Sequence, residues 1–67
     1  MRIILNNTPL NLPDDFMTIE QLLQWKNINP AGTAVAINNK IIKKDIWDTV
    51  KFENNDSVTI ISAAYGG

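Results

Sequence analysis

The residues best suited to chemistry stand at the end of the sequence, where Tyr65 is followed by Gly66 and Gly67. We expect Gly67 to carry a free α-carboxylate that another protein could activate. Because neither glycine has a Cβ, the backbone beside this carboxylate is thin and rotates freely, so it can enter a channel that a side chain would block. Chain ends are also often frayed, and the glycine pair has functional meaning only if the preceding residues form a suitable carrier.

The remaining residues offer little for autonomous catalysis. The 67 residues include no cysteine and no histidine, which removes the commonest nucleophile, general base and metal ligand. The net charge of −1 gives no general attraction to nucleic acid or to an anionic membrane. No apolar run approaches a membrane span, and residues 1–5 do not form a signal peptide. We therefore expect a monomeric cytoplasmic protein that is not an enzyme and has no metal or cofactor of its own.

Hydrophobic periodicity and turn residues predict one domain over residues 1–67, with 63–67 as a flexible functional tail. Strands are predicted at 2–5, 9–12, 33–38, 40–42 and 57–62, with asparagine pairs in the two hairpin turns. Thr18 and Gln21 form a capping box that begins a helix at 19–26, and one further helical turn is expected within 45–50. The order of these elements predicts an α+β fold, in which one helix covers one face of a mixed sheet of four to five strands.

The first and last strands are rich in β-branched residues and low in charge, so we place them side by side at the centre. The intervening helix acts as a crossover, and the two strands must then run parallel. Strand alternation and helix periodicity predict the core residues, with Trp47 and Phe52 closing its ends. The other predicted core residues are Ile3, Leu5, Val35, Ile37, Val58 and Ile60 from the sheet, beneath Ile19, Leu22 and Leu23 from the helix.

The opposite face of the sheet has no helix to cover it, and alternation places Ile4, Ala34, Ala36 and Ile61 there. This small apolar patch is either incidental exposure or a docking platform for a protein that acts on Gly67. A cluster of lysines at 40, 43 and 44 is either a solvated sheet edge or a contact with an acidic partner.

The whole chain resembles the ubiquitin-like β-grasp sulfur carriers, most closely the ThiS-like carriers of thiamine biosynthesis. The residues that carry the resemblance are Ile3–Asn6, Thr18–Leu23, Ala34–Asn38, Trp47, the Asn55-Asp56 turn and Gly66-Gly67. One departure is Asn55, where the family often has glycine; asparagine adopts the same left-handed conformation.

The resemblance implies a route for sulfur. A ubiquitin-activating-like adenylyltransferase of the ThiF type would adenylate the Gly67 carboxylate, and a persulfide sulfur donor would convert it to a thiocarboxylate. A thiazole synthase of the ThiG type would then accept the sulfur. In this scheme Gly67 carries the reacting group, Gly66 gives access, and Tyr65 helps to seat the tail.

Two alternatives remain at this point. The small subunit of molybdopterin synthase shares the fold, the tail and the thiocarboxylate chemistry, although that family is usually somewhat longer. A β-grasp interaction or RNA-binding module belongs to a different class and would not need a free Gly-Gly end. The chain shows no basic face interleaved with aromatic residues, which such an RNA-binding module would use.

Overall fold

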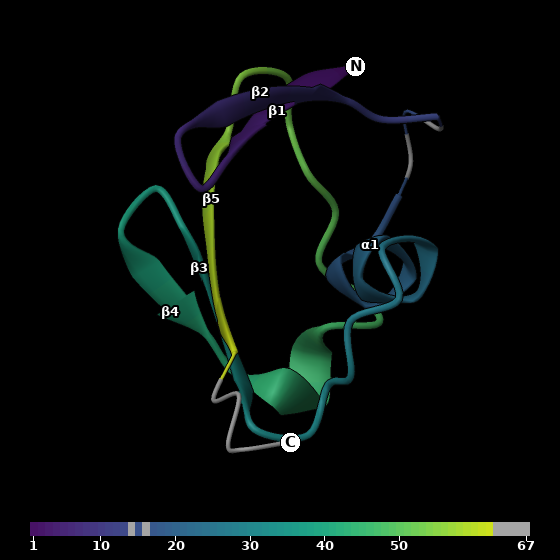
Figure 1. The fold of residues 1–67 in the computed structure, drawn as a ribbon, viewed down its shortest axis with the longest axis vertical. Helices are drawn as coiled ribbons and strands as arrows, with labels where there is room; N and C mark the ends of the chain where they lie inside the picture. Colours follow the sequence, from purple (N-terminus) through teal and green to yellow (C-terminus); the bar gives the residue numbers. More distant parts are fainter. Residues whose placement is uncertain (14, 16, 63–67) are drawn as a thin grey trace.

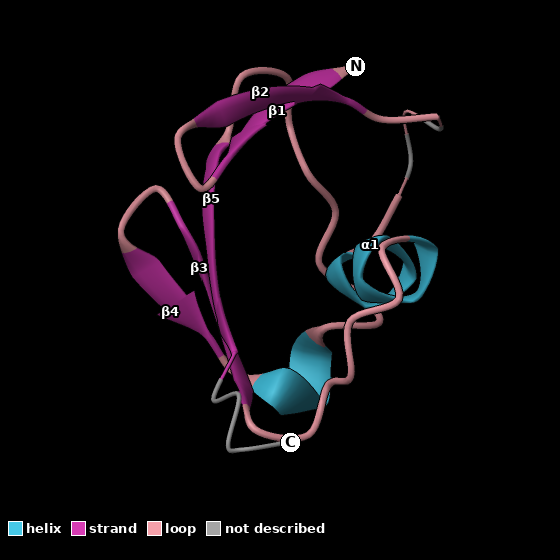
Figure 2. Cartoon of the chain, in the orientation of Figure 1, coloured by secondary structure: helices cyan, strands magenta, loops and turns pink. Residues whose placement is uncertain are grey.

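The computed structural model describes residues 1–13, 15 and 17–62, and it contains a five-stranded mixed sheet with one α-helix and one short 3₁₀ helix (Figures 1 and 2). The strand order across the sheet is β2-β1-β5-β3-β4. The elements in chain order are β1 (Arg2–Leu5), β2 (Thr8–Asn11), α1 (Ile19–Trp25), β3 (Thr33–Ile37), β4 (Lys40–Ile42), η1 (Lys44–Ile46) and β5 (Ser57–Ser62).

These elements confirm the predicted fold, with small differences at their ends. β1, β4 and β5 have the predicted bounds, whereas β2 begins and ends one residue earlier, at Thr8 and Asn11. α1 ends at Trp25 and β3 at Ile37, each one residue short of the prediction. The extra helical turn begins at Lys44, just before the segment predicted for it. Element ends depend on local hydrogen bonds that hydrophobic periodicity does not encode.

β1 and β5 lie side by side and run parallel, as predicted, with Ile4 beside Ser57 and Leu5 beside Val58. β3 pairs with β5 in the antiparallel sense, so β5 is held on both sides in the middle of the sheet. Both α1 and η1 lie on the same side of the sheet, which leaves its other face without a helix (Figure 1).

The core fills the space between the sheet and α1. Ile3, Ile19 and Leu22 are fully buried, and Trp47 and Phe52 are buried with them, as predicted. Leu5 and Ile37 are only half-buried, because they lie toward the ends of their strands and pack against the rim of the cluster. The other buried hydrophobic residues are Leu12, Met17, Leu23, Val35, Val58 and Ile60.

Asparagine forms the tight turns of this chain. Among the described residues, every non-glycine residue with a positive φ is an asparagine, including both members of the hairpin pairs at 6–7 and 38–39. Positive φ at both central residues gives a two-residue turn the twist that antiparallel strands require. Asn55 has φ 69°, which confirms the left-handed conformation predicted for this residue before β5.

Both ends of α1 are closed by local hydrogen bonds. At its start, Thr18 and Gln21 form the predicted capping box. At its end, Asn27 has φ 58°, and the amide of Ile28 donates to the carbonyl of Leu23 at 2.8 Å. This is a Schellman motif, in which an apolar residue just past the helix packs back onto its last turn. A helix of seven residues depends on such caps and on burial, because its intrinsic stability is low.

The Asn6-Asn7 turn provides a matched test of a side-chain contribution to the sheet. Both residues have positive φ, but only the Asn6 side chain bonds to β5, at the amide and carbonyl of Ile60. Glycine adopts either backbone conformation, so we expect Asn6→Gly to lower the free energy of unfolding by about 1–3 kcal/mol more than Asn7→Gly does. Urea denaturation of the two variants measures this difference, and equal losses would contradict it.

Candidate functional site

The candidate site begins where β5 ends, because the five residues after Ser62 include the predicted reacting end. Ser62 pairs with Thr33 at the start of β3, which fixes the end of β5 on that side. On the other side, the Oδ1 atom of Asn6 accepts a hydrogen bond of 2.9 Å from the amide of Ile60. This side-chain contact extends the β1 side of the sheet after the main chain has turned into the first hairpin. Tyr65, Gly66 and Gly67 lie outside the described residues.

Thr33 anchors the strand that holds the end of β5. Its side chain is buried, and its hydroxyl donates a hydrogen bond of 2.6 Å to the carbonyl of Asn29. Its amide donates to the carbonyl of Pro30 at 3.2 Å. The loop after α1 is thereby tied to the first residue of β3, and the helix, the loop and the end of β5 form one connected unit.

The opposite end of β5 is fixed by a buried carboxylate. The Oδ2 atom of Asp56 accepts from the amide of Glu53 at 2.8 Å, and its Oδ1 atom accepts from the Asn38 side chain at 3.0 Å. The Oδ1 atom of Asn38 in turn accepts from the amide of Ser57. These bonds compensate the loss of hydration of the carboxylate and align β5 with the hairpin between β3 and β4. The sequence shows a turn here but does not reveal these partners.

The face of the sheet opposite α1, called the open face below, contains the four predicted docking residues. Strand pairing sets Ile61 beside Ala34, and Ile4 beside Ser57. Ile61 is 64% exposed and Ala34 is exposed, whereas Ile4 and Ala36 are half-buried. The four residues therefore share one face, and Ile61 belongs to the strand that leads into residues 63–67. Their role in docking stays a prediction.

The sequence analysis missed Ile41, an isoleucine of this face that is more exposed than Ile61. It is 77% exposed and lies directly beside Ala36, because the two-residue turn at 38–39 sets Ile37 opposite Lys40 and Ala36 opposite Ile41. This placement followed from the predicted turn and strand alternation, so the sequence did contain the signal. The lysine of the same strand, Lys40, points to the other side with Ile37.

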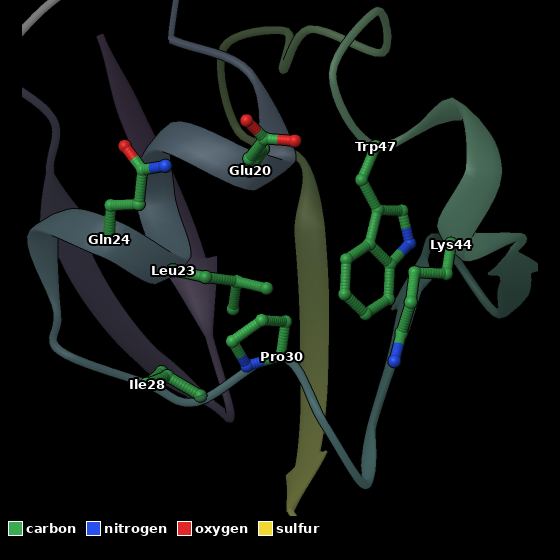
Figure 3. Close-up of a pocket in the computed structure, with 7 residues that line it drawn as sticks. All are labelled: Glu20, Leu23, Gln24, Ile28, Pro30, Lys44 and Trp47. Carbon is green, nitrogen blue, oxygen red and sulfur yellow. The ribbon is translucent and has the colours of Figure 1, made fainter.

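A pocket of about 270 Å³ lies on the other side of the molecule, between α1 and η1 (Figure 3). The Trp47 ring forms one wall, Leu23 and Pro30 lie across from it, and Glu20 stands at the rim (Figure 3). Trp47 and Leu23 are almost completely buried, so these two residues expose little apolar surface to the pocket. The Nε1 atom of Trp47 donates to the carbonyl of Ile42 at 2.9 Å, which assigns this side chain to packing. That role agrees with the predicted one.

Residues 1–13, 15 and 17–62 contain no group of three acidic, histidine or cysteine side chains close enough to hold a metal ion. No helix within these residues has the length and apolar character needed to cross a membrane.

Comparison with known proteins connects this architecture to a family. The model of the ThiS family matches residues 3–67, which include all of the elements described above except the first residue of β1, together with the final glycine pair. The chain belongs to the ThiS family. This membership confirms the resemblance inferred from the sequence, and it favours ThiS over the molybdopterin synthase subunit as the relative of this chain.

Solved structures agree with the assignment of this ThiS-family chain at the level of the fold. The crystal structure of the thiamine biosynthesis protein ThiS from Geobacter metallireducens is 17% identical, with full coverage of both chains and a TM-score of 0.85. The solution NMR structure of a thiamine biosynthesis protein from the same organism is 19% identical and gives a TM-score of 0.82, covering all of this chain and 88% of that one. No curated protein matches the sequence closely enough to count as a relative.

Substitutions at two neighbouring residues of β5 test whether the open face contributes to the stability of the fold. Ile60 is buried in the core, whereas Ile61 is exposed on the open face. We expect Ile60→Thr to lower the free energy of unfolding by roughly 2–4 kcal/mol, because it removes buried carbon and buries a hydroxyl. Ile61→Thr should change this free energy by no more than about 0.5 kcal/mol. Chemical denaturation compares the two, and a large loss for Ile61→Thr would show that the open face supports the fold.

Proposed function

We propose that this chain is a sulfur carrier of thiamine biosynthesis, with the Gly67 carboxylate as the site that carries sulfur. The observation that supports this most strongly is the ThiS-family match, which runs through the β-grasp domain to Gly66 and Gly67. The fold agrees with this role, because β5, the strand that precedes the last five residues, pairs with both β1 and β3.

The chemistry requires activation, because a carboxylate resists attack by a nucleophile. An oxygen of the Gly67 carboxylate attacks the α-phosphorus of ATP, pyrophosphate leaves, and the product is a mixed anhydride with AMP. The terminal sulfur of a persulfide then attacks the carbonyl carbon and expels AMP, which gives an acyl disulfide. A thiol cleaves the disulfide, leaves the thiocarboxylate on Gly67, and is itself oxidised to a disulfide with the donor. The thiocarboxylate sulfur passes to a thiazole synthase.

The carrier contributes a substrate group and a surface, and its partners contribute the catalytic groups. The sequence has no cysteine or histidine, so the base, the nucleotide site and the persulfide belong to other proteins. These partners are a ThiF-type adenylyltransferase, a persulfide sulfur donor and a ThiG-type thiazole synthase. Gly66 lets the end enter a narrow active site, and Tyr65 seats it there.

The open face gives the partners a place to dock. Ile61 and Ala34 lie side by side, and Ile61 is six residues from Gly67. Docking through Ile4, Ala34, Ala36 and Ile61 holds the tail close to the partner's active site. Confinement of this kind raises the effective concentration of the carboxylate at the site of adenylation.

Mass spectrometry of the intact chain tests the carrier function directly. Incubation with the ThiF-type enzyme of the same organism, ATP and a persulfide donor should exchange one oxygen for one sulfur in the C-terminal peptide. Adding one alanine after Gly67 should abolish this exchange, because the carboxylate then moves beyond the position that the active site accepts. Localisation to the C-terminal peptide is essential, since oxidation of Met1 or Met17 changes the mass similarly.

The control is Gln24→Ala, an exposed position on α1, which should leave the exchange unchanged. If the wild-type chain stays unmodified although the enzyme has been shown to be active, the proposed carrier function is wrong. An interaction module would be the better explanation in that case.

A further inference from the structure

The open face has a distinct shape in addition to its apolar character, because small side chains lie between large ones. β3 lies between β4 and β5 and presents only methyl side chains to this face, from Ala34 and Ala36. Ile41 rises on the β4 side beside Ala36, and Ile61 rises on the β5 side beside Ala34. Strand spacing and rise separate the two isoleucines by roughly 12 Å along a diagonal. The result is a shallow trough along β3, with an alanine floor and an exposed isoleucine on each side.

Among the described residues, the charged side chains that strand alternation assigns to the open face have one sign. Lys43 follows β4 with extended backbone angles, φ −64° and ψ 140°, and it is two residues from Ile41, so alternation places it on the open face. Arg2 lies on the same face at the far end of β1. No strand position of this face in the described chain carries an acidic residue. These positions are Arg2, Ile4, Pro9, Asn11, Ala34, Ala36, Ile41, Ser57, Thr59 and Ile61.

Neither edge of the sheet is well suited to pairing with a strand of another protein. β2 is one edge strand and contains Pro9, which has no amide hydrogen to donate to an added strand. β4 is the other edge; it is three residues long and is followed by two lysines. Short, charged or proline-containing edges oppose pairing with another chain. The open face therefore offers a better contact than either edge.

We propose that the trough receives a protein partner with an apolar ridge that lies along β3, between Ile41 and Ile61, and with carboxylates that face Lys43. The ridge contacts the two alanines, whose small side chains permit close approach, and both isoleucines lose their exposure to water. The partner is the activating enzyme of the proposed function, so this inference depends on that function. It adds to that function the anchor residue Ile41, an apolar ridge on the partner and carboxylates of the partner beside this ridge, called the acidic rim below.

The same features disfavour nucleic acid as the occupant. Binding to single strands depends on exposed aromatic rings that stack on bases and on a row of cations along the backbone. The open-face strand positions include no aromatic residue, and the only cation among them is Arg2. Exposed Trp25 belongs to α1, on the other side of the sheet (Figure 1).

The test measures adenylation kinetics of the full chain with the ThiF-type enzyme, using pyrophosphate release as the readout. We expect Ile41→Ala to raise KM for the carrier about tenfold with little change in kcat, because truncating an interface anchor weakens docking. Ile46→Ala is the matched control, since this isoleucine is exposed on η1, on the side of α1. An unchanged KM for Ile41→Ala would overturn the assignment of this anchor.

A second variant tests the shape of the partner. Ala34→Leu adds apolar surface at an exposed position but fills the trough. The larger side chain would displace a ridge that lies along β3, so KM should rise at least about fivefold. A partner with a flat apolar surface would instead bind this variant more tightly, because leucine adds apolar contact. An equal or lower KM would overturn the ridge.

Charge reversal tests the acidic rim. Lys43→Glu should slow association several-fold at low salt, and the difference should shrink as salt is raised. Lys26→Glu, at the residue that caps the end of α1, makes the same change in net charge away from the trough and should leave the kinetics unchanged. Equal effects of the two reversals would overturn the acidic rim.

The outcomes also separate this inference from the proposed function. If wild-type chain is not adenylated by an enzyme shown to be active, the proposed function fails. If it is adenylated and the open-face variants behave as wild type, only the docking inference fails. Binding of wild-type chain to vesicles of anionic phospholipid that is lost in Ile41→Ala would assign the face to a membrane and would also overturn the inference.

Discussion

The parallel pairing of β1 with β5 is the interaction on which the rest of this structure depends. It joins the first and last strands at the centre of the sheet, and it requires the connection through α1 that covers one face. The main-chain pairing is short, and the side chain of Asn6 extends it to Ile60. Without this extension β5 would have only β3 beside its second half, where the candidate site begins.

The division between the two faces of the sheet follows from this pairing. Once β1 and β5 are central, strand alternation sends Ile3, Val58 and Ile60 toward α1 and sends Ile4 and Ile61 to the open face. The first group supplies the burial that stabilises a small domain, and we expect the more exposed second group to contribute less to stability. Changes on the open face can therefore alter recognition without loss of the fold, which suits a carrier that meets several enzymes.

Much of this arrangement could be predicted from the sequence, because its strongest signals are local. The capping box of α1, the asparagine turns and the alternation in β5 each specify their own element. The low charge and β-branched residues of the first and last strands placed these two strands side by side at the centre of the sheet. The contacts that could not be predicted join distant residues. The Asp56 carboxylate bonds to Asn38, and Thr33 bonds to the carbonyl of Asn29, through geometry that appears only after packing. Ile41 is different, because turn length and alternation already placed it beside Ala36.

A carrier without catalytic groups must obtain its specificity from shape and charge, and the open face combines both. The apolar trough favours close contact, whereas Lys43 and the absence of acidic residues at its strand positions favour an acidic partner. Electrostatic attraction acts mainly on the rate of encounter, and apolar contact acts mainly on the lifetime of the complex. A carrier must also leave each enzyme after its reaction. Under the proposed function, a small trough with two isoleucine anchors would combine rapid association with a complex weak enough to separate, as successive adenylation, sulfur transfer and delivery by one tail would require.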